Sequence, residues 1–461
     1  MTATSPTPHL RRGFGTREAL ALNISNMVGV GPFLTIPLMI ASMGGPQAIL
    51  GWIAGAALAI CDGLVWSELG AALPGSGGSY HFLREVYGRE SWGRLLAFLF
   101  IWQFVLSGPL EIASGMIGFA QYTGFLWPGM GAWSARFLAA GVGALALALL
   151  YRRNASLGKI TITIGIGTVL TMAAILVLGL PHVQFAQAFA FPPAAWNFDR
   201  GFFYGLGSAT LIAMYNYMGY YDVCYIGDEV RNPGRAIPRS ILGAIAICVA
   251  GYIAIYVVLL GVVPWRQAEG SAFIVSSFMA RLYGHTAAVA ITLLVLWTAF
   301  GSVFALLFGY SRIPYAAAVD GTFFRVFGRL HPRKEFPHVS LLTLGGVAMV
   351  AAFFPLGAVI NALITTRLLV QFMGQAAAIP LLRRHWPQAQ RPYRMWLYPL
   401  PALAAFVGWG LVFVSSGASY IALGLMTLAV GTGVYFWRAR RAGYWPFVMK
   451  SDGMTPTVTA S

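Results

Sequence analysis

The chain has 461 residues, of which 58% are hydrophobic and only 10% charged, and its mean hydropathy is +0.70. This composition excludes a soluble globular protein, because apolar runs of about 20 residues, each long enough to cross a hydrocarbon core of roughly 30 Å, recur from end to end. The formal charge of +16 does not require a nucleic-acid partner, because Lys and Arg gather in the cytoplasmic loops of membrane proteins. We therefore expect a multi-pass protein that lies in the lipid bilayer.

The apolar runs predict an all-α membrane protein with twelve transmembrane helices. Together they form a single domain over residues 17–438, between a polar tail at 1–16 and another at 439–461. In chain order, the expected spans are 17–43, 46–72, 92–125, 133–151, 160–180, 203–228, 239–263, 285–317, 338–355, 357–382, 397–416 and 418–438.

The basic residues fix the orientation that we expect for these spans. With the first tail in the cytoplasm, the alternation of sides places 25 of the 30 Lys and Arg residues on the cytoplasmic side. Arg136, Arg200, Arg266 and Arg281 fall outside, and Arg367 falls within a span. Such a split follows the positive-inside rule. It predicts a protein of the cytoplasmic (inner) membrane with both termini in the cytoplasm.

Two spans are interrupted by residues that do not suit a helix in lipid. Gly29–Pro32 stands in the first span and Met218–Asp222 in the sixth. Irregular backbone at membrane depth persists only where it is buried in protein or lines a wet cavity. Residues 17–180 and 203–382 each open with such a broken helix, which is the pattern of an inverted five-plus-five repeat with a site near the bilayer midplane. The last two spans, within 397–438, lie outside this repeat.

Each break offers groups that can bind a small zwitterion or amine. At the first break, the N–H groups of Val30 and Gly31 would stand at a helix N-terminus, which holds anions. At the second break, the ring of Tyr215 could cover an ammonium group by cation–π attraction, and the carbonyls of Tyr215 and Met218, beside Gly219, could accept from it. The alternatives are a proline kink at the first break and a tyrosine-rich interfacial turn at the second.

Acidic residues within the spans are the least expected side chains, because a carboxylate in lipid is costly and is a functional candidate by default. Glu111 follows a weak point in the third span and could bind a cationic group or carry a coupling proton. The alternative is that it pairs with Arg367. Asp62 and Asp222 are further candidates for a charge or proton-coupling role. Glu68 lies near a span end, where a structural ion pair with loop arginines is the better expectation.

The order of five motifs resembles the amino acid–polyamine–organocation transporter superfamily over nearly the whole chain. The resemblance implies a fold like that of the sodium-coupled leucine transporter, with a midplane site. It implies that Val30 and Gly31 bind a carboxylate and that the carbonyls of Met27, Tyr215 and Met218 bind an amine. Gly-Pro-Phe at 31–33, with the acids at 62 and 111, looks like the polyamine-uptake branch. The motifs are residues 26–33, 67–80, 227–239, 311–321 and 391–399.

These features predict a secondary active transporter of amino acids or related small organic amines that works by alternating access. The acids favour cationic cargo, such as polyamines or basic amino acids, and uptake or exchange of neutral amino acids is the alternative. A membrane sensor that keeps the fold without transport is an alternative of another class. No catalytic set, metal site or cofactor is expected, whereas a coupling proton or an exchanged substrate is. The sequence leaves the oligomeric state open.

Overall fold

The computed structural model describes residues 14–75, 77–151, 157–334, 336–385, 391–444 and 446–447, and for residues 157–166 and 385 only the backbone. The predicted tail at 1–16 lies outside the described residues up to residue 13, as does most of the tail at 439–461. The described part is helical. Within it, the only extended pairing is an isolated bridge between Phe14 and Val230. The expectation of an all-α protein is therefore confirmed.

The first half of the chain begins with a bent helix, as the sequence predicted. Helices α1 (Thr16–Met27) and α2 (Gly31–Met43) meet at a bend of 50° across the first break. A short amphipathic helix, α4, follows the second predicted span and was not expected from the sequence. The remaining elements of this half are η1 (Pro46–Ala48), α3 (Ile49–Ala72), α4 (Ser79–Val86), α5 (Trp92–Leu126), α6 (Ala132–Leu150), α7 (Leu157–Gly179) and η3 (Leu180–His182).

The second half also begins with a broken span, but the segment after this break is not an α-helix. Helix α9 (Arg200–Tyr217) stops at the second break, and the chain continues as two 3₁₀ turns, η4 (Asp222–Tyr225) and η5 (Gly227–Glu229), rather than as a second α-helix. The other elements are α8 (Phe185–Ala188), α10 (Pro233–Leu260), α11 (Trp265–Glu269), α12 (Ile274–Tyr310), α13 (Arg312–Val319), η6 (Arg325–Gly328), α14 (His338–Ala351), α15 (Leu356–Arg367), η7 (Leu368–Met373), α16 (Gly374–His385), α17 (Leu400–Ser415) and α18 (Ala418–Arg441).

Length and composition make seven of the described helical segments able to cross a membrane, or eight when α1 and α2 count as one bent span. Three shorter apolar helices, Gly167–His182, His338–Ala351 and Leu400–Ser415, fall below that length. The structure therefore supports a multi-pass membrane protein with fewer self-sufficient spans than the twelve expected. The physical reason is that a broken or short helix does not cover the hydrocarbon thickness by itself.

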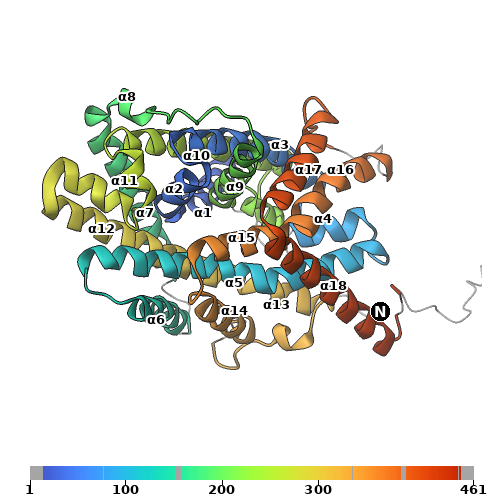
Figure 1. The fold of residues 1–461 in the computed structure, drawn as a ribbon. Helices are drawn as coiled ribbons and strands as arrows, with labels where there is room; N and C mark the ends of the chain where they lie inside the picture. The colour runs from blue at the N-terminus through green and yellow to red at the C-terminus, as the bar shows by residue number, and fades with distance from the viewer. Residues whose placement is uncertain are drawn as a thin grey trace, which may run out of the picture.

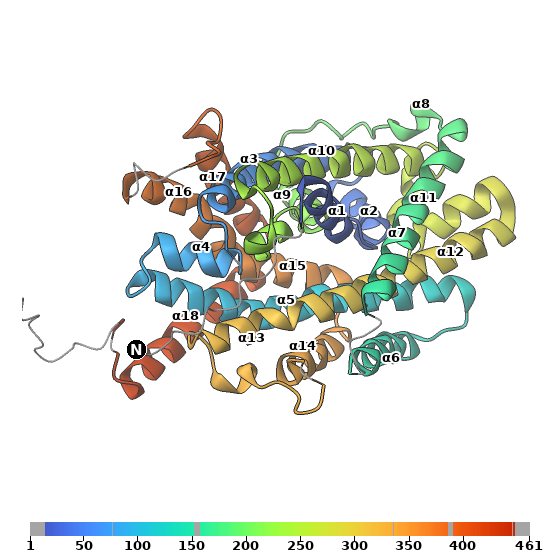
Figure 2. The same ribbon diagram turned by 180° about the vertical axis from the view of Figure 1, so that it is seen from behind.

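The broken helices occupy the centre of the bundle. Figure 1 and, from behind, Figure 2 show α1, α2 and α9 enclosed by the longer helices. Helix α9 packs on α2 and α3, α1 packs on α10, and α5 packs on α12 and α15. This enclosure buries the irregular backbone in protein, as a membrane interior requires.

The two ends of the bundle separate the connecting segments in the way that the basic residues predicted. In both views, α4 and α16 lie at one end, and α8 and α11 lie at the opposite end. The sequence assigned α4 and the residues that end α16, after the tenth predicted span, to the cytoplasmic side, and α8 and α11 to the outer side. The fold is therefore consistent with the predicted alternation of sides.

Glu68, near the end of α3, ties together the segments at the α4–α16 end. Its fully buried carboxylate accepts hydrogen bonds of 2.8 and 2.7 Å from Arg383 and one of 2.9 Å from the N–H of Met395. Arg391 lies 3.3 Å from the same carboxylate. A buried carboxylate needs such compensation, and the structural ion pair expected for Glu68 is confirmed.

Candidate functional site

The two breaks touch each other through their backbones. Gly219 has a φ of +107°, and a Cβ atom at this position would lie 2.9 Å from the carbonyl carbon of Asn26 and 3.0 Å from the nitrogen of Met27. A side chain at residue 219 would therefore be strained in its own backbone and would collide with a rigid main chain. Glycine is required here because it brings the end of α9 against the end of α1.

Asparagine side chains satisfy polar groups that the breaks release. The Oδ1 atom of Asn23 accepts a 3.0 Å hydrogen bond from the N–H of Val223, which lies beyond the second break. The Nδ2 group of Asn26 donates a 2.8 Å bond to Asp222. Both bonds join α1 to the 3₁₀ turn that follows α9. The bond to Val223 compensates a buried N–H group, which would cost about 1–3 kcal/mol if left unpaired, whereas the bond to Asp222 lies at an exposed position.

At the first break, a backbone carbonyl is already hydrogen-bonded, whereas two backbone N–H groups are not. The carbonyl of Met27 accepts a 2.6 Å hydrogen bond from the hydroxyl of Tyr252 on α10. Within the part of the chain that the structure describes, the N–H groups of Val30 and Gly31 have no hydrogen-bond partner. They stand at the N-terminus of α2, where partial positive charge accumulates. This end of α2 therefore has the character of an anion site.

A cavity of about 70 Å³ lies at the junction of the breaks. It brings together six of the seven residues that the sequence predicted for substrate binding, with Gly219 packed behind them. The predicted residues at the cavity are Met27, Val30, Gly31, Glu111, Tyr215 and Met218, and its other lining residues are Ser25, Asn26, Gly29, Ser114, Gly115, Asn216, Ser302, Ala305 and Leu306.

Asn216 adds an acceptor that the sequence analysis did not assign. Its Nδ2 group donates to Thr35 at 2.9 Å, whereas its Oδ1 atom is buried and has no partner among the described residues. A Cβ atom on Gly31 would lie 2.5 Å from that oxygen. The unpaired acceptor therefore faces the first break from α9, close to the free donors of α2.

Tyr215 forms part of the cavity wall and is held there by its hydroxyl. The hydroxyl lies 2.7 Å from Oγ of Ser114 on α5, and Ser114 in turn donates to the carbonyl of Glu111 at 2.6 Å. The ring is thereby fixed between α9 and α5. The predicted place of Tyr215 beside the site agrees with this geometry, and its role as an aromatic cover remains a prediction.

Glu111 is paired, as the alternative in the sequence analysis proposed. Its Oε2 atom lies 2.7 Å from Nη1 of Arg367 at the end of α15 and accepts a 2.8 Å hydrogen bond from Tyr310. The side chain of Arg367 is 3% exposed and that of Glu111 is 15% exposed. The carboxylate at the cavity is therefore neutralised by a buried cation rather than left free.

The two other acids lie away from the cavity. Asp62 is fully buried and accepts hydrogen bonds from Tyr220 at 2.5 Å and from Trp409 at 3.1 Å. These bonds join α3 to the second break and to α17, an arrangement suited to a structural role. Asp222 lines a separate, larger cavity, where it accepts the bond from Asn26.

This larger cavity, of about 380 Å³, is a vestibule next to the first one. The two share Asn26, Ala305 and Leu306 as lining residues. The vestibule extends from there to Tyr80 on α4 and to Glu229, both at the end of the bundle that the sequence assigned to the cytoplasm. A path between the small cavity and that end therefore passes Asn26.

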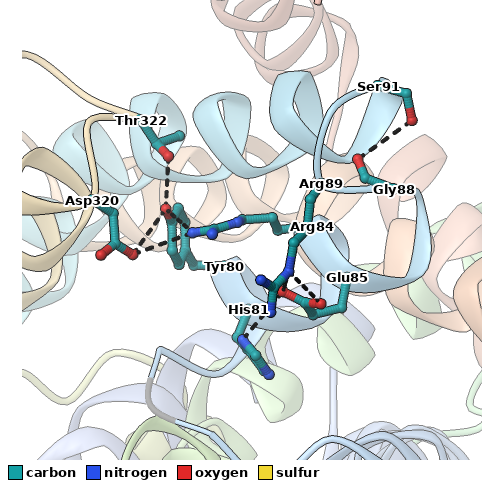
Figure 3. Close-up of polar contacts among 9 residues, drawn as sticks. All are labelled: Tyr80, His81, Arg84, Glu85, Gly88, Arg89, Ser91, Asp320 and Thr322. Carbon is teal, nitrogen blue, oxygen red and sulfur yellow. Dashed lines mark hydrogen bonds and ion pairs between the residues drawn. The ribbon is translucent and has the colours of Figure 1, made fainter. Parts of the chain in front are cut away.

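Tyr80 marks the rim of the vestibule and joins two connecting segments. Figure 3 shows three contacts at its hydroxyl, which donates to Asp320 at 3.2 Å, accepts from Arg84 at 3.2 Å and lies 2.7 Å from Oγ1 of Thr322. Burial raises the pKa of Tyr80 above its ordinary value, so the hydroxyl keeps its proton and remains a donor. Arg84 also pairs with Asp320 at 3.4 Å. The helix α4 is thus held to the turn that follows α13.

The sequence analysis missed three asparagines, Asn23, Asn26 and Asn216, as members of the site. A signal was present, because each is an uncharged polar residue inside an apolar run and close to a break. Polar side chains in transmembrane helices form hydrogen bonds across helices. Applied to amides as well as to acids, the same reasoning predicts contacts between the two breaks.

Comparison with known proteins gives a consistent result over most of the chain. A family model described as "Amino acid permease" matches residues 14–435. The mouse cationic amino acid transporter 4 is 28% identical over 400 residues, covering 81% of this chain and 60% of that protein. The branched-chain amino acid permease of Lactococcus lactis is 26% identical and the serine/threonine exchanger of Bacillus subtilis is 25% identical, each covering 87% of this chain and 90% of the relative.

The share of the relatives that is covered differs between the animal and the bacterial proteins. The chain spans 60% of the mouse transporter and 57% of its human counterpart. It spans 90% of each of the two bacterial relatives above. The names of these proteins refer to different cargoes, namely cationic amino acids, branched-chain amino acids, and serine and threonine.

The contact between the two breaks can be tested with Gly219→Ala. We expect a lower melting temperature in detergent, because the methyl group adds a main-chain collision, of the kind that costs about 1–3 kcal/mol, to the strain of a positive φ. Gly417→Ala is the matched control, since Gly417 has a φ of +96° and no atom nearer than 3.9 Å. Equal destabilisation of both variants would contradict the close contact.

Proposed function

Because the chain belongs to the amino acid permease family, we propose that it is a secondary active transporter that carries amino acids across the cytoplasmic membrane by alternating access. One observation carries this proposal: two broken helices meet at a small cavity where, among the described residues, the N–H groups of Val30 and Gly31 and the Oδ1 atom of Asn216 have no partner. Paired breaks of this kind are the pointer to a midplane transport site.

The cavity suits the zwitterionic end of an amino acid. The free N–H groups of Val30 and Gly31 would bind the carboxylate at the start of α2. The ammonium group would be bound by the carbonyls of Tyr215 and Met218 and by the second lone pair of the Met27 carbonyl, whose first accepts from Tyr252, with the unpaired Oδ1 of Asn216 as a further acceptor. Backbone groups would then recognise what all amino acids share.

The membrane arrangement that we propose is the one predicted from the sequence. Twelve spans would cross the bilayer, with residues 17–180 and 203–382 forming an inverted five-plus-five repeat and with both termini in the cytoplasm. The broken helix at the start of each half supports the repeat. The gathering of α4 and α16 at one end and of α8 and α11 at the other supports the alternation of sides.

We propose that the vestibule is the inner path of the transport cycle. Its volume of about 380 Å³ lies between the site and the proposed cytoplasmic end, which supports an inner path for the cargo. Asn26 and Asp222, bonded to each other at 2.8 Å, stand on this path. We propose Asp222, rather than the fully enclosed Asp62, as the acid that responds to a coupling proton or to passing cargo.

The proposal is tested by uptake into proteoliposomes of the purified full-length chain. We expect saturable accumulation of at least one labelled L-amino acid, driven by a pH gradient or by an internal pool of exchangeable amino acid. Liposomes without protein are the control. Binding of amino acids without uptake under either driving force would contradict transport and would favour the alternative of a membrane sensor.

The tyrosine at the cavity wall gives a second test. Tyr215→Ala should reduce uptake far more than Tyr215→Phe, because the ring faces the site, whereas the phenylalanine loses only the hydroxyl bond to Ser114. A neutral hydrogen bond contributes about 1 kcal/mol, so we expect a severalfold loss at most for Tyr215→Phe. The measurement is the initial rate of uptake at equal protein density. Equal losses in both variants would show that the hydroxyl, and not the ring, is the functional group.

A further inference from the structure

Glu111 lines the cavity and belongs to a buried ion pair, whose other member, Arg367, is not itself a lining residue. Glu111 on α5 and Arg367 at the end of α15 lie 2.7 Å apart, with side chains 15% and 3% exposed. A buried ion that loses its partner is strongly destabilised, because no water replaces the lost interaction. Glu111 and Arg367 therefore each neutralise the charge of the other, which would otherwise be buried without a partner.

Neighbouring side chains hold each charge in place. The Nε group of Arg367 donates to Oγ of Ser107 at 2.9 Å, and its guanidinium carbon lies 5.4 Å from the ring centre of Phe104 and 5.6 Å from that of Tyr310. The hydroxyl of Tyr310 donates to Oε2 of Glu111. The backbone becomes π-helical in η7 directly after Arg367, a form that is frequent at functional sites.

The pair is fixed, yet its capacity for hydrogen bonds is not used up. The Nη2 group of Arg367 is buried and has no partner among the described residues. Both bonds described for the carboxylate of Glu111 fall on Oε2, while the residue itself lines the cavity. The donor and the acceptor that remain belong to opposite charges, so neither sign dominates this wall.

The position of the pair matches the place of a cargo side chain. If the breaks bind the carboxylate and the ammonium group of an amino acid, its side chain points toward the remaining wall. That wall comes from α5 and α12, with Glu111, Ser114, Ser302 and Leu306 among its residues. The side chain of the cargo would therefore meet Glu111 already occupied by Arg367.

We propose that the Glu111–Arg367 pair sets the charge class of the cargo and selects amino acids with uncharged side chains. A cationic side chain would have to compete with Arg367 for Glu111, and an acidic one with Glu111 for Arg367. Arg367 acts as a positioning residue that masks the carboxylate. This inference rests on the proposed function and changes the expected cargo from cationic amines to the neutral alternative, because the free acid on which the cationic preference rested is paired.

The test compares single and double removal of the two charges. Uptake of labelled L-leucine, L-lysine and L-glutamate is measured in proteoliposomes with the wild type, Glu111→Gln, Arg367→Gln and the double variant. We expect the wild type to prefer leucine. Arg367→Gln should raise the ratio of lysine to leucine uptake, and Glu111→Gln the ratio of glutamate to leucine, each by at least about tenfold, which corresponds to about 1.4 kcal/mol. The double variant should again prefer leucine over lysine and glutamate.

A control pair separates this effect from a general effect of charge. Glu85→Gln and Arg89→Gln break an Arg–Glu contact of the same 2.7 Å length on α4 and its following turn, where Arg89 is 62% exposed. Exposed pairs contribute little, so both control variants should keep the wild-type ratios.

A further variant covers the case in which a single charge deletion fails to fold. Glu111→Asp keeps both charges but withdraws the carboxylate by one methylene group. It should raise lysine and glutamate uptake together relative to leucine. If the pair only stabilises the fold, each variant should instead lower the uptake of all three amino acids by the same factor.

The outcomes distinguish this inference from the proposed function. Unchanged cargo ratios in the folded variants, or a wild type that prefers lysine or glutamate while transporting well, would overturn the charge-masking role and leave amino acid transport intact. A wild type that transports none of a full panel of amino acids would contradict the proposed function itself.

Discussion

A helix that breaks inside a hydrocarbon layer releases backbone groups that find no water there, and the rest of this structure depends on how those groups are satisfied. The hydroxyl of Tyr252 donates to the carbonyl of Met27, and the side chain of Asn23 accepts from the N–H of Val223. Gly219 lets the two breaks lie in contact. Among the described residues that line the small cavity, the amides of Val30 and Gly31 and the side-chain oxygen of Asn216 remain without a partner. These groups give the central cavity its polarity.

The division of work between backbone and side chains follows from this constraint. In the proposed mechanism, backbone groups bind the ends that every amino acid shares, so cargo selection falls to the opposite wall. There, the charges of Glu111 and Arg367 cancel each other, and their neighbours Tyr310 and Ser107 hold them in place.

The breaks could be predicted from the sequence because glycine and proline act locally, and residues 29–32 and 218–222 contain them within apolar runs. The sequence offered the pairing of Glu111 with Arg367 as an alternative but could not decide for it, because the two residues lie in distant spans and only packing brings them together. The enclosure of Asp62 by Tyr220 and Trp409 could not be predicted, because it arises from α3, the second break and α17. The short helix after the second span was missed because eight residues carry too little periodicity against a strongly apolar background.

The central claim is that backbone groups at the breaks bind both charged ends of an amino acid, and competition for uptake tests it most directly. Labelled L-leucine uptake into proteoliposomes is measured against unlabelled leucine, leucine methyl ester and 4-methylpentanoate, which keep the side chain but lack the carboxylate or the amine. Because a site built for hydrogen bonds rejects an analogue that leaves its groups unpaired, leucine should compete at least about tenfold better than either analogue. Equal competition by the ester or by the acid would contradict recognition at the breaks.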